Sequence, residues 1–188
     1  MGRAQDDEKR KKRNQLYLGV ALVLVMIFSI VGFGFQVQDD DPSGGNTLSY
    51  NGYSFVNSGG FWIVQIGQVQ FSFLFSPQET PSVGESLNKL NYYVNQPLYI
   101  SSESYDAQGE ILRNLDGIVL RIQEACTEEE ECPGNFPIKT CEDNFIVIRE
   151  GNLTAIEQNE GCVYITGPSQ DLPMITDEFL YKIIGIKN

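Results

Sequence analysis

The feature that most constrains this chain is a stretch of 20 residues without a charge, from Leu16 to Phe35. As a helix, such a stretch is about 30 Å long, which matches the hydrocarbon core of a bilayer. Five basic residues (9–13) directly precede it, and three aspartates (39–41) follow it. Because basic flanks stay on the cytoplasmic side, the sequence predicts a single-pass cell-membrane anchor with a cytoplasmic N-terminus and an extracytoplasmic C-terminal domain.

A cleaved secretory signal is the alternative interpretation of this stretch. Cleaved signals have an apolar core of about 7–15 residues that ends at an Ala-x-Ala-like site. The stretch here is longer, and its nearest small-x-small site is Gly32-Phe33-Gly34. A buried core helix is disfavoured because no polar face interrupts the run. We therefore expect an uncleaved signal anchor that contacts the lipid bilayer through residues 16–35.

Charge separates a basic tail from an acidic remainder. Residues 1–14 contain six basic and three acidic residues, whereas the rest of the chain contains seven basic and 22 acidic residues. Nucleic-acid phosphates require a basic patch, so the outer domain is not expected to bind nucleic acid. The charge does not identify the envelope protein that would be its partner.

Composition divides the chain into four parts. A basic cytoplasmic tail (1–14) and a transmembrane helix (15–35) precede a flexible linker (36–47) that contains the sequence Pro-Ser-Gly-Gly. Residues 48–188 are enough for one extracytoplasmic domain with its own core. We expect an α+β fold, in which the transmembrane helix precedes a mixed β-sheet domain with antiparallel hairpins, a βαβ-like unit and a C-terminal helix.

The first part of the outer domain has the pattern of an antiparallel meander. Strands are predicted at 53–56, 61–66 and 69–75, with glycine-containing turns between them. Apolar and polar residues alternate in the last strand, so one face is expected in the core and the other in water. The expected core residues of that strand are Val69, Phe71, Phe73 and Phe75.

Helices and strands alternate in the remainder. A capping box at Ser82–Glu85 and apolar residues at helical spacing predict a helix that ends near Val94. A strand at 97–100, a helix at 106–115 and a strand from 118 toward Cys126 suggest a βαβ crossover with parallel strands. The helix at 106–115 is expected to bury Ile111, Leu112 and Leu115. Further predicted elements are strands at 145–148, 153–156 and 163–165 and a helix at 172–186.

Four cysteines in a domain predicted to lie in an oxidising compartment indicate disulfide bonds. They are Cys126, Cys132, Cys141 and Cys162. Three connectivities are possible. We favour 126–132, which closes an acidic loop, and 141–162, which joins the starts of two strands that an intervening strand would let run parallel. A zinc site without tight Cys-x₂₋₄-Cys pairs and a redox pair at 126 and 132 without Cys-x-x-Cys spacing are less favoured alternatives.

Catalytic motifs are scarce in this chain. It has no histidine, which excludes Ser-His-Asp and Cys-His mechanisms. It also contains no phosphate-binding loop, dinucleotide fingerprint or nucleophile elbow. A pair of acids for glycoside hydrolysis has no fixed spacing, so that possibility stays open. No catalytic residue, cofactor or metal ligand is predicted.

Three further patterns have a structural and a functional interpretation. Asn152-Leu153-Thr154 is an N-glycosylation triplet in a turn-like position, which makes Asn152 a possible glycosylation site. The run Glu128–Glu131 could attract Ca²⁺, but consecutive residues do not converge on one ion, and a solvated loop is favoured. The aromatic residues of the meander could offer a partner surface, although a core role is favoured.

Several stretches recur together in a familiar layout. They are SYNGYSF followed by FWIVQIGQVQFSFLFSP, then NLDGIVLRIQEAC, then IKTCEDNFIVIRE before GCVYITG and a closing helix. In this layout the chain resembles an uncharacterised group of small single-pass archaeal membrane proteins. The resemblance covers most of the chain. It implies an archaeal envelope setting and no known activity, so it assigns no functional residue.

These patterns predict a membrane-anchored extracytoplasmic module that binds or scaffolds an envelope partner without catalysis. A second hypothesis is an archaeal pilin-like filament subunit, because a charged leader directly precedes an apolar helix. Asn14 stands before that helix, where pilin processing sites usually have Gly or Ala. A third hypothesis is a membrane-tethered hydrolase that uses acidic residues.

Overall fold

A computed structural model of the chain describes residues 47–83, 87–128, 132 and 135–188. The predicted tail and transmembrane helix lie outside the described residues, as does the linker apart from Thr47. Among the residues that are described, no helix is long and apolar enough to cross a membrane.

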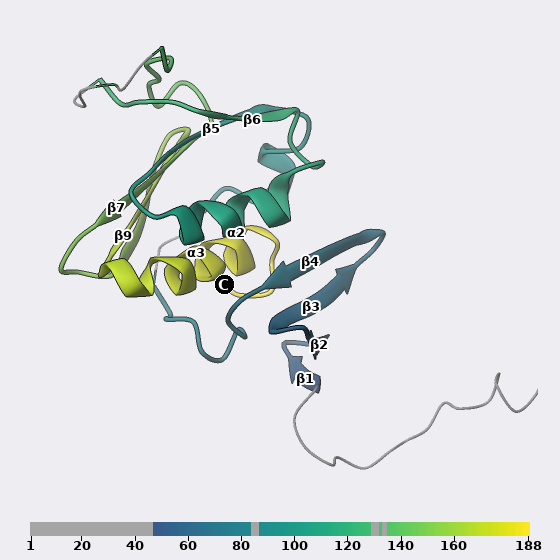
Figure 1. Cartoon of the computed structure of the whole chain (residues 1–188). Coiled ribbons are helices and arrows are strands. Elements are labelled where there is room, and N and C mark those ends of the chain that lie inside the picture. Colours follow the sequence, from purple (N-terminus) through teal and green to yellow (C-terminus); the bar gives the residue numbers. More distant parts are fainter. Residues whose placement is uncertain (1–46, 84–86, 129–131, 133–134) are drawn as a thin grey trace, which may run out of the picture. The chain divides into compact units, whose positions relative to one another are not determined.

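The described chain begins with a four-stranded antiparallel meander, in the order β1–β2–β3–β4 (Figure 1). Strands β2, β3 and β4 confirm the predicted strands, whereas β1 was not predicted. The turns between them are two residues long, and in the first turn Asn51 and Gly52 both have positive φ, as such hairpins require. The strands are β1 (Thr47–Tyr50), β2 (Tyr53–Ser58), β3 (Phe61–Ile66) and β4 (Val69–Phe73).

Alternation in the meander places one face in the core, as predicted. Phe71 and Phe73 of β4 are buried, together with Phe55 of β2. The prediction for Val69 was wrong, because this residue stands at the first position of β4, beside the turn, and is 40% exposed. Phe75 lies beyond the end of β4 and is half-buried.

The second sheet has five strands in the order β6–β5–β7–β9–β8. β5 runs parallel to β6 and β7, and β7 runs parallel to β9, so the predicted βαβ crossover and the predicted parallel pair are both confirmed. Only β8 is antiparallel to its neighbour. The strands are β5 (Pro97–Ser102), β6 (Arg121–Glu124), β7 (Phe145–Glu150), β8 (Ala155–Asn159) and β9 (Cys162–Gly167).

Two strands begin later than predicted. The amide groups of Ile118 and Val119 both donate to the carbonyl of Leu115, which closes a turn after the preceding helix and delays β6 to Arg121. β8 begins at Ala155, because the residues before it form an exposed turn.

Two helices, α2 (Tyr105–Leu115) and α3 (Leu172–Ile183), lie between the two sheets (Figure 1). The Ser104 side chain caps α2 by accepting from the Ala107 amide. Leu112 is 39% exposed, contrary to prediction, because one residue corresponds to about 100° of helix and turns it away from its buried neighbour Ile111. α3 stops three residues before the predicted end, where Gly185 adopts a left-handed conformation.

The helix predicted to end near Val94 is not formed by the described residues. Residues 87–89 have no regular structure, and only a short 3-10 turn, η1, spans Leu90–Tyr92. The Asn88 amide bonds the Gln158 side chain at 2.7 Å, and Asn95 adopts a left-handed φ of 56°. Asparagine favours such turns, so local chemistry overrides the apolar spacing. Residues 84–86 lie outside the described part of the chain.

Side chains of the helices bind the outer edge of β4. The Asn114 side chain accepts from the Ser72 amide at 2.8 Å and donates to the Ser72 carbonyl at 2.9 Å, so it takes the place of a neighbouring strand. Asp177 accepts from the Phe75 amide at 2.9 Å, and the Tyr181 hydroxyl donates to the Phe75 carbonyl at 2.7 Å. These bonds fix the meander to α2 and α3.

Two buried carboxyl groups meet at this docking point. Glu110 of α2 and Asp177 of α3 are 0% exposed and interact through their side chains, and one oxygen of each, Glu110 Oε2 and Asp177 Oδ1, has no hydrogen-bond partner among the described residues. Burial, and then the negative charge of Glu110, raise the pKa of Asp177 well above its ordinary value. Arg113 pairs with Glu110, while other ionisable groups around Asp177 and Tyr181 are Glu79 and Glu178. Asp177 is therefore the carboxyl whose protonated form the fold favours.

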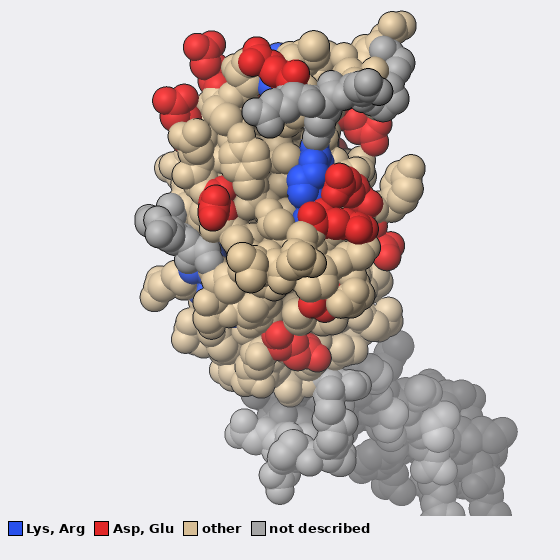
Figure 2. All heavy atoms as spheres, turned by 90° about the vertical axis from the view of Figure 1, so that its left-hand side faces the viewer, with Lys and Arg blue, Asp and Glu red and all other residues tan. Residues whose placement is uncertain are grey.

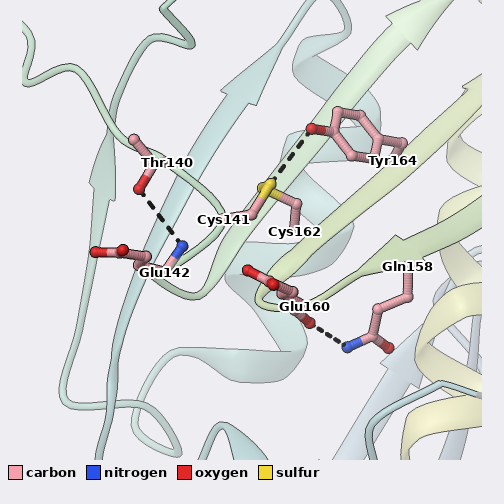
Figure 3. The surroundings of a disulfide bond; sticks show 7 residues. All are labelled: Thr140, Cys141, Glu142, Gln158, Glu160, Cys162 and Tyr164. Carbon is pink, nitrogen blue, oxygen red and sulfur yellow. Dashed lines mark hydrogen bonds between the residues drawn. A yellow bond between two sulfur atoms is a disulfide. The ribbon is translucent and has the colours of Figure 1, made fainter.

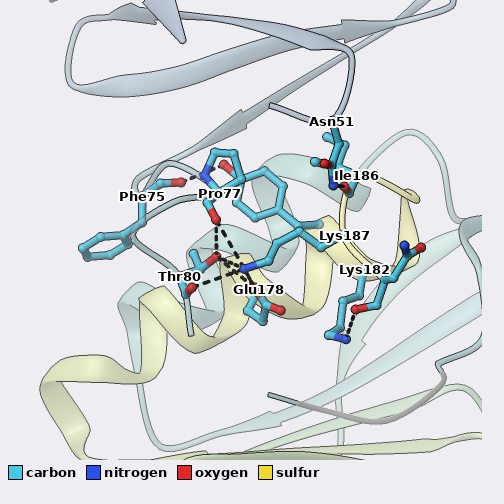
Figure 4. Close-up of polar contacts among 10 residues, drawn as sticks. Asn51, Phe75, Pro77, Thr80, Glu178, Lys182, Ile186 and Lys187 are labelled. Atoms are coloured by element: carbon cyan, nitrogen blue, oxygen red, sulfur yellow. Dashed lines mark hydrogen bonds and ion pairs between the residues drawn. The ribbon is translucent and has the colours of Figure 1, made fainter. Parts of the chain in front are cut away.

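A second buried ion pair holds the C-terminus against the loop after β4 (Figure 4). Lys187 pairs with Glu178, and its ammonium group also donates to the carbonyls of Pro77 (3.3 Å) and Thr80 (3.2 Å). The Thr80 hydroxyl donates to Glu178 at 2.8 Å. The loop after β4, the last residues of the chain and α3 are therefore connected in one polar cluster.

We predict that Asp177→Asn removes a pH dependence of stability. A carboxyl with a raised folded-state pKa stabilises the fold fully below its ordinary pKa of about 3.9, and this contribution is lost as pH rises toward the raised value. The free energy of unfolding of the wild type should fall by up to about 1.4 kcal/mol per pH unit between these two pKa values. The carboxamide introduced by the substitution can still donate to Glu110 and accept from Phe75, so the variant's profile should be flatter.

Urea unfolding of the purified full-length protein between pH 4 and pH 8 measures this difference. Asp116→Asn is the matched control, because Asp116 is exposed at the end of α2. Parallel profiles for the wild type and Asp177→Asn would contradict the assignment of the proton.

We also predict that Lys187→Met lowers the free energy of unfolding by about 3–5 kcal/mol, because it leaves the Glu178 carboxylate buried without its cation. The double variant Lys187→Met, Glu178→Met removes both charges, so its free energy of unfolding should fall less than that of the single variant. Chemical denaturation of the three proteins measures both effects. A double variant that is less stable than Lys187→Met would refute this explanation.

Candidate functional site

A groove of about 810 Å³ lies at the edge of the second sheet where β5 and β7 begin. Its walls come from three segments, 87–92, 96–97 and 142–144. A neighbouring hollow of about 680 Å³ shares Asn88, Tyr92 and Glu142 with it and extends to the β8–β9 turn. We call the two together the amide groove.

Carboxamides are the commonest kind of side chain in the lining of the amide groove. Those of Asn88, Asn91, Gln96 and Asn144 make no hydrogen bond to another residue within the described part of the chain. Each carries two N–H donors and one carbonyl acceptor, so these groups can bind a ligand. The carboxamides that line the groove are Asn88, Asn91, Gln96, Asn144 and Gln158.

Contacts with the core hold the 87–92 wall in position. The Gln158 side chain accepts from the Asn88 amide and donates to the Glu160 carbonyl at 2.9 Å, which joins this wall to the β8–β9 turn. The Lys89 ammonium donates to the carbonyl of Lys182 in α3 at 3.0 Å. The wall is thus tied at two points to elements of the core.

Two neighbouring tyrosines have different environments at this wall. Tyr93 is buried, with its ring edge-on to Phe179 of α3, and burial raises the pKa of its hydroxyl. Tyr92 packs edge-on against Tyr93 with 5.5 Å between ring centroids, and it remains 43% exposed. The core thus positions one aromatic ring at the surface of the groove.

The Cys141–Cys162 disulfide and a close backbone contact form the opposite wall (Figure 3). The Gly161 amide donates to the Cys141 carbonyl at 2.9 Å, and the Gly161 carbonyl accepts from Phe145 at 3.0 Å. A Cβ atom at Gly161 would lie 2.2 Å from the carbonyl oxygen of Asp143. Only glycine permits this approach of the 141–144 loop to the β8–β9 turn.

The charged side chains that line the groove are mainly acidic. Glu142, Asp143 and Glu160 carry carboxylates, and Lys89 is the lining cation. Asp143 also pairs with Lys139 at 3.2 Å. Within the described residues, no three acidic, cysteine or histidine side chains are grouped as a metal site would need. The groove therefore presents neutral amides and carboxylates to a ligand.

A smaller hollow of about 360 Å³ lies on the sheet face opposite the helices. Figure 2 views the molecule from the β7 and β9 side and shows a small group of basic side chains beside acidic ones. Arg121 donates to the Tyr99 hydroxyl at 2.9 Å, and this bond, then a bond from Lys139, lowers the pKa of Tyr99. Arg149 donates to the Ser101 hydroxyl at 2.8 Å. These cations are already engaged in contacts within the domain.

The cysteines form the connectivity that the sequence favoured, Cys126–Cys132 and Cys141–Cys162. Cysteines bound in disulfides offer no thiolate for zinc, so the alternative metal site is disfavoured. The first bridge closes the acidic loop. Glu128 lines the smaller hollow, whereas residues 129–131 lie outside the described part of the chain.

The other singled-out residues lie away from the groove. Asn152 is exposed in the turn after β7, at the end of that strand opposite Asn144. The meander aromatics are mainly in or against the core, as favoured. Sequence reasoning missed the groove, because it assigned 82–94 to a helix. The high content of Asn, Gln and Tyr in NKLNYYVNQ (88–96) is the sequence feature that could have indicated a polar binding surface there.

Comparisons of the chain with protein families, curated proteins and solved structures found no match. The amide groove, the two disulfides and the apolar segment at 16–35 are therefore the observations that bear on function.

We predict opposite effects of alanine at two glycines. Gly161→Ala should destabilise the protein by about 1–3 kcal/mol, because the 141–144 loop has to move away from the β8–β9 turn. Gly109→Ala is the matched control. Gly109 lies in the middle of α2, and no atom outside its own helical backbone lies within 4 Å of the added Cβ. The free energy of unfolding should therefore rise by about 0.5–1 kcal/mol. Thermal and chemical denaturation measure both, and equal changes would contradict this packing.

Proposed function

We propose that the protein is a membrane-tethered extracytoplasmic binding module of the cell envelope, without catalytic activity. The observation that carries this proposal is the pairing of all four cysteines in disulfides within the domain that follows the apolar segment. Structural disulfides persist in oxidising compartments and are rare in the cytosol. The two disulfides agree with an outer domain on the extracytoplasmic side, which is the orientation that the basic residues at 9–13 predict.

The amide groove is the surface that we propose for binding. It is wide, its walls are fixed by the disulfide, Gln158 and Lys89, and its carboxamides have unused bonding capacity. Groups held in place before a ligand arrives lose little entropy on binding, which favours recognition. The layout resemblance to archaeal membrane proteins suggests an archaeal envelope as the setting.

Two other functions would use the same chain differently. A pilin-like subunit would lose its basic leader on maturation. A hydrolase would need two carboxyl groups at a substrate, and Glu142, Asp143 and Glu160 border the groove. Each of these functions predicts a covalent change that a binding module does not. The filament subunit would itself be cleaved, and the hydrolase would cleave its ligand.

Membrane topology tests the proposal. In intact spheroplasts, external protease should digest the outer domain and leave the basic tail protected. Intact-mass analysis of the membrane-extracted protein should give the full-length mass, with cysteines that react with an alkylating reagent only after reduction. Four reactive thiols before reduction, or an outer domain that resists protease until the membrane is opened, would overturn the proposal. Loss of about 14 or about 34 N-terminal residues would instead favour a filament subunit or a secreted protein.

A further inference from the structure

We infer that the amide groove binds neutral saccharides, and that its carboxamides recognise sugar hydroxyl groups while Tyr92 packs on a sugar ring. This inference rests on the proposed function only in taking the groove as the binding surface. The ligand class is inferred from two observations. One is the kind of side chain that lines the groove, and the other is that the basic residues of the domain already make contacts within it.

Hydroxyl-rich ligands match the carboxamides. Neighbouring sugar hydroxyls present alternating donors and acceptors, and a carboxamide offers an N–H donor and a carbonyl acceptor in one plane. Four such groups with no bond to another described residue face the two connected hollows. The carboxylates of Glu142 and Glu160 add strong acceptors for hydroxyl protons.

Tyr92 supplies the apolar part of the site. One face of a pyranose ring presents C–H groups, which pack on aromatic rings, and the tyrosine hydroxyl can also form a hydrogen bond. The ring of Tyr92 is exposed at the groove and is supported from behind by buried Tyr93. Such a ring is positioned at little entropic cost on binding.

Charge disfavours anionic ligands. All seven basic residues beyond the apolar segment make contacts inside the domain, so the groove would not neutralise a phosphate or a sugar acid. Lys89 and Lys182 donate to carbonyls, Arg113, Lys139 and Lys187 pair with acids, and Arg121 and Arg149 bond hydroxyls of Tyr99 and Ser101. The three lining carboxylates would repel an anion.

Binding of defined oligosaccharides tests the ligand class. The full-length protein in lipid nanodiscs, free of glycoside detergents, is titrated calorimetrically with maltotriose, mannotriose and N,N′-diacetylchitobiose. A trisaccharide that contains glucuronic acid is the anionic probe. The groove variants are Tyr92→Ala and Asn144→Ala.

Each groove variant has a matched control outside the groove. Tyr105→Ala removes a tyrosine that is 91% exposed at the start of α2, and Asn152→Ala removes the exposed asparagine after β7. Both Asn144 and Asn152 flank β7, at opposite ends. Melting temperatures of all variants show whether a loss of binding reflects unfolding.

We expect at least one neutral saccharide to bind. Tyr92→Ala and Asn144→Ala should weaken that binding tenfold or more at unchanged melting temperature, whereas the controls should change it less than twofold. Absence of binding to every neutral probe, equal effects of groove and control variants, or preference for the anionic probe would overturn the ligand class.

The outcomes separate this inference from the proposed function. An outer domain that is external but binds no saccharide would refute the ligand class and leave the membrane-tethered module intact. A cytoplasmic outer domain would refute the proposed function whatever the groove binds. A saccharide recovered in shortened form would support the ligand class and overturn the non-enzymatic role.

Discussion

The polar contacts that α2 and α3 make with the edge of β4 and with Phe75 just beyond it are the interaction on which the rest of the structure depends. A strand edge that is covered by helices needs partners for its amide and carbonyl groups, and Asn114, Asp177 and Tyr181 provide them. α3 is buried along nearly its whole length, because the second sheet covers its other side. Two of its polar side chains, Asp177 and Tyr181, bond the backbone of Phe75 and so dock the meander. Burial, and then the charge of Glu110, raise the pKa of Asp177, and a neutral Asp177 avoids the repulsion that two ionised carboxylates would meet in the core.

The same helix also positions the candidate site. Phe179 supports Tyr93, and the carbonyl of Lys182 binds Lys89, so the 87–92 wall of the amide groove is built on α3. The opposite wall depends on Gly161 and on the disulfide at the starts of β7 and β9. The groove is thus bounded by elements whose places are set by the core and by a covalent bond. Rigid walls of this kind let loop side chains present defined bonding groups to a ligand.

Sequence patterns foresaw the elements whose formation depends on local alternation and spacing. Strands β2, β3 and β4 of the meander, the βαβ crossover, the parallel β7/β9 pair and helix α3 all follow from such patterns. The helix predicted over 87–94 is not formed, because asparagines with their own turn preferences and a bond from the Asn88 amide to the Gln158 side chain override the apolar spacing. Burial of Glu110 and Asp177 could not be foreseen, since a carboxylate on a helix is ordinarily solvated. The two residues are distant from each other in sequence and meet only in the fold.

Scarcity of cations links the fold to the proposed ligand. Seven basic residues serve a domain (48–188) with 19 acids, and the fold uses them to neutralise buried carboxylates, bond backbone carbonyls and fix tyrosine and serine hydroxyls. A surface that remains negative repels anionic polymers and favours solubility. In the proposed saccharide site, the carboxamides of the amide groove provide donors that its carboxylates lack. The acidity of the chain disfavours anionic ligands, and its amide-rich segment offers donors and acceptors for hydroxyl groups. Both features therefore favour uncharged, hydroxyl-rich ligands.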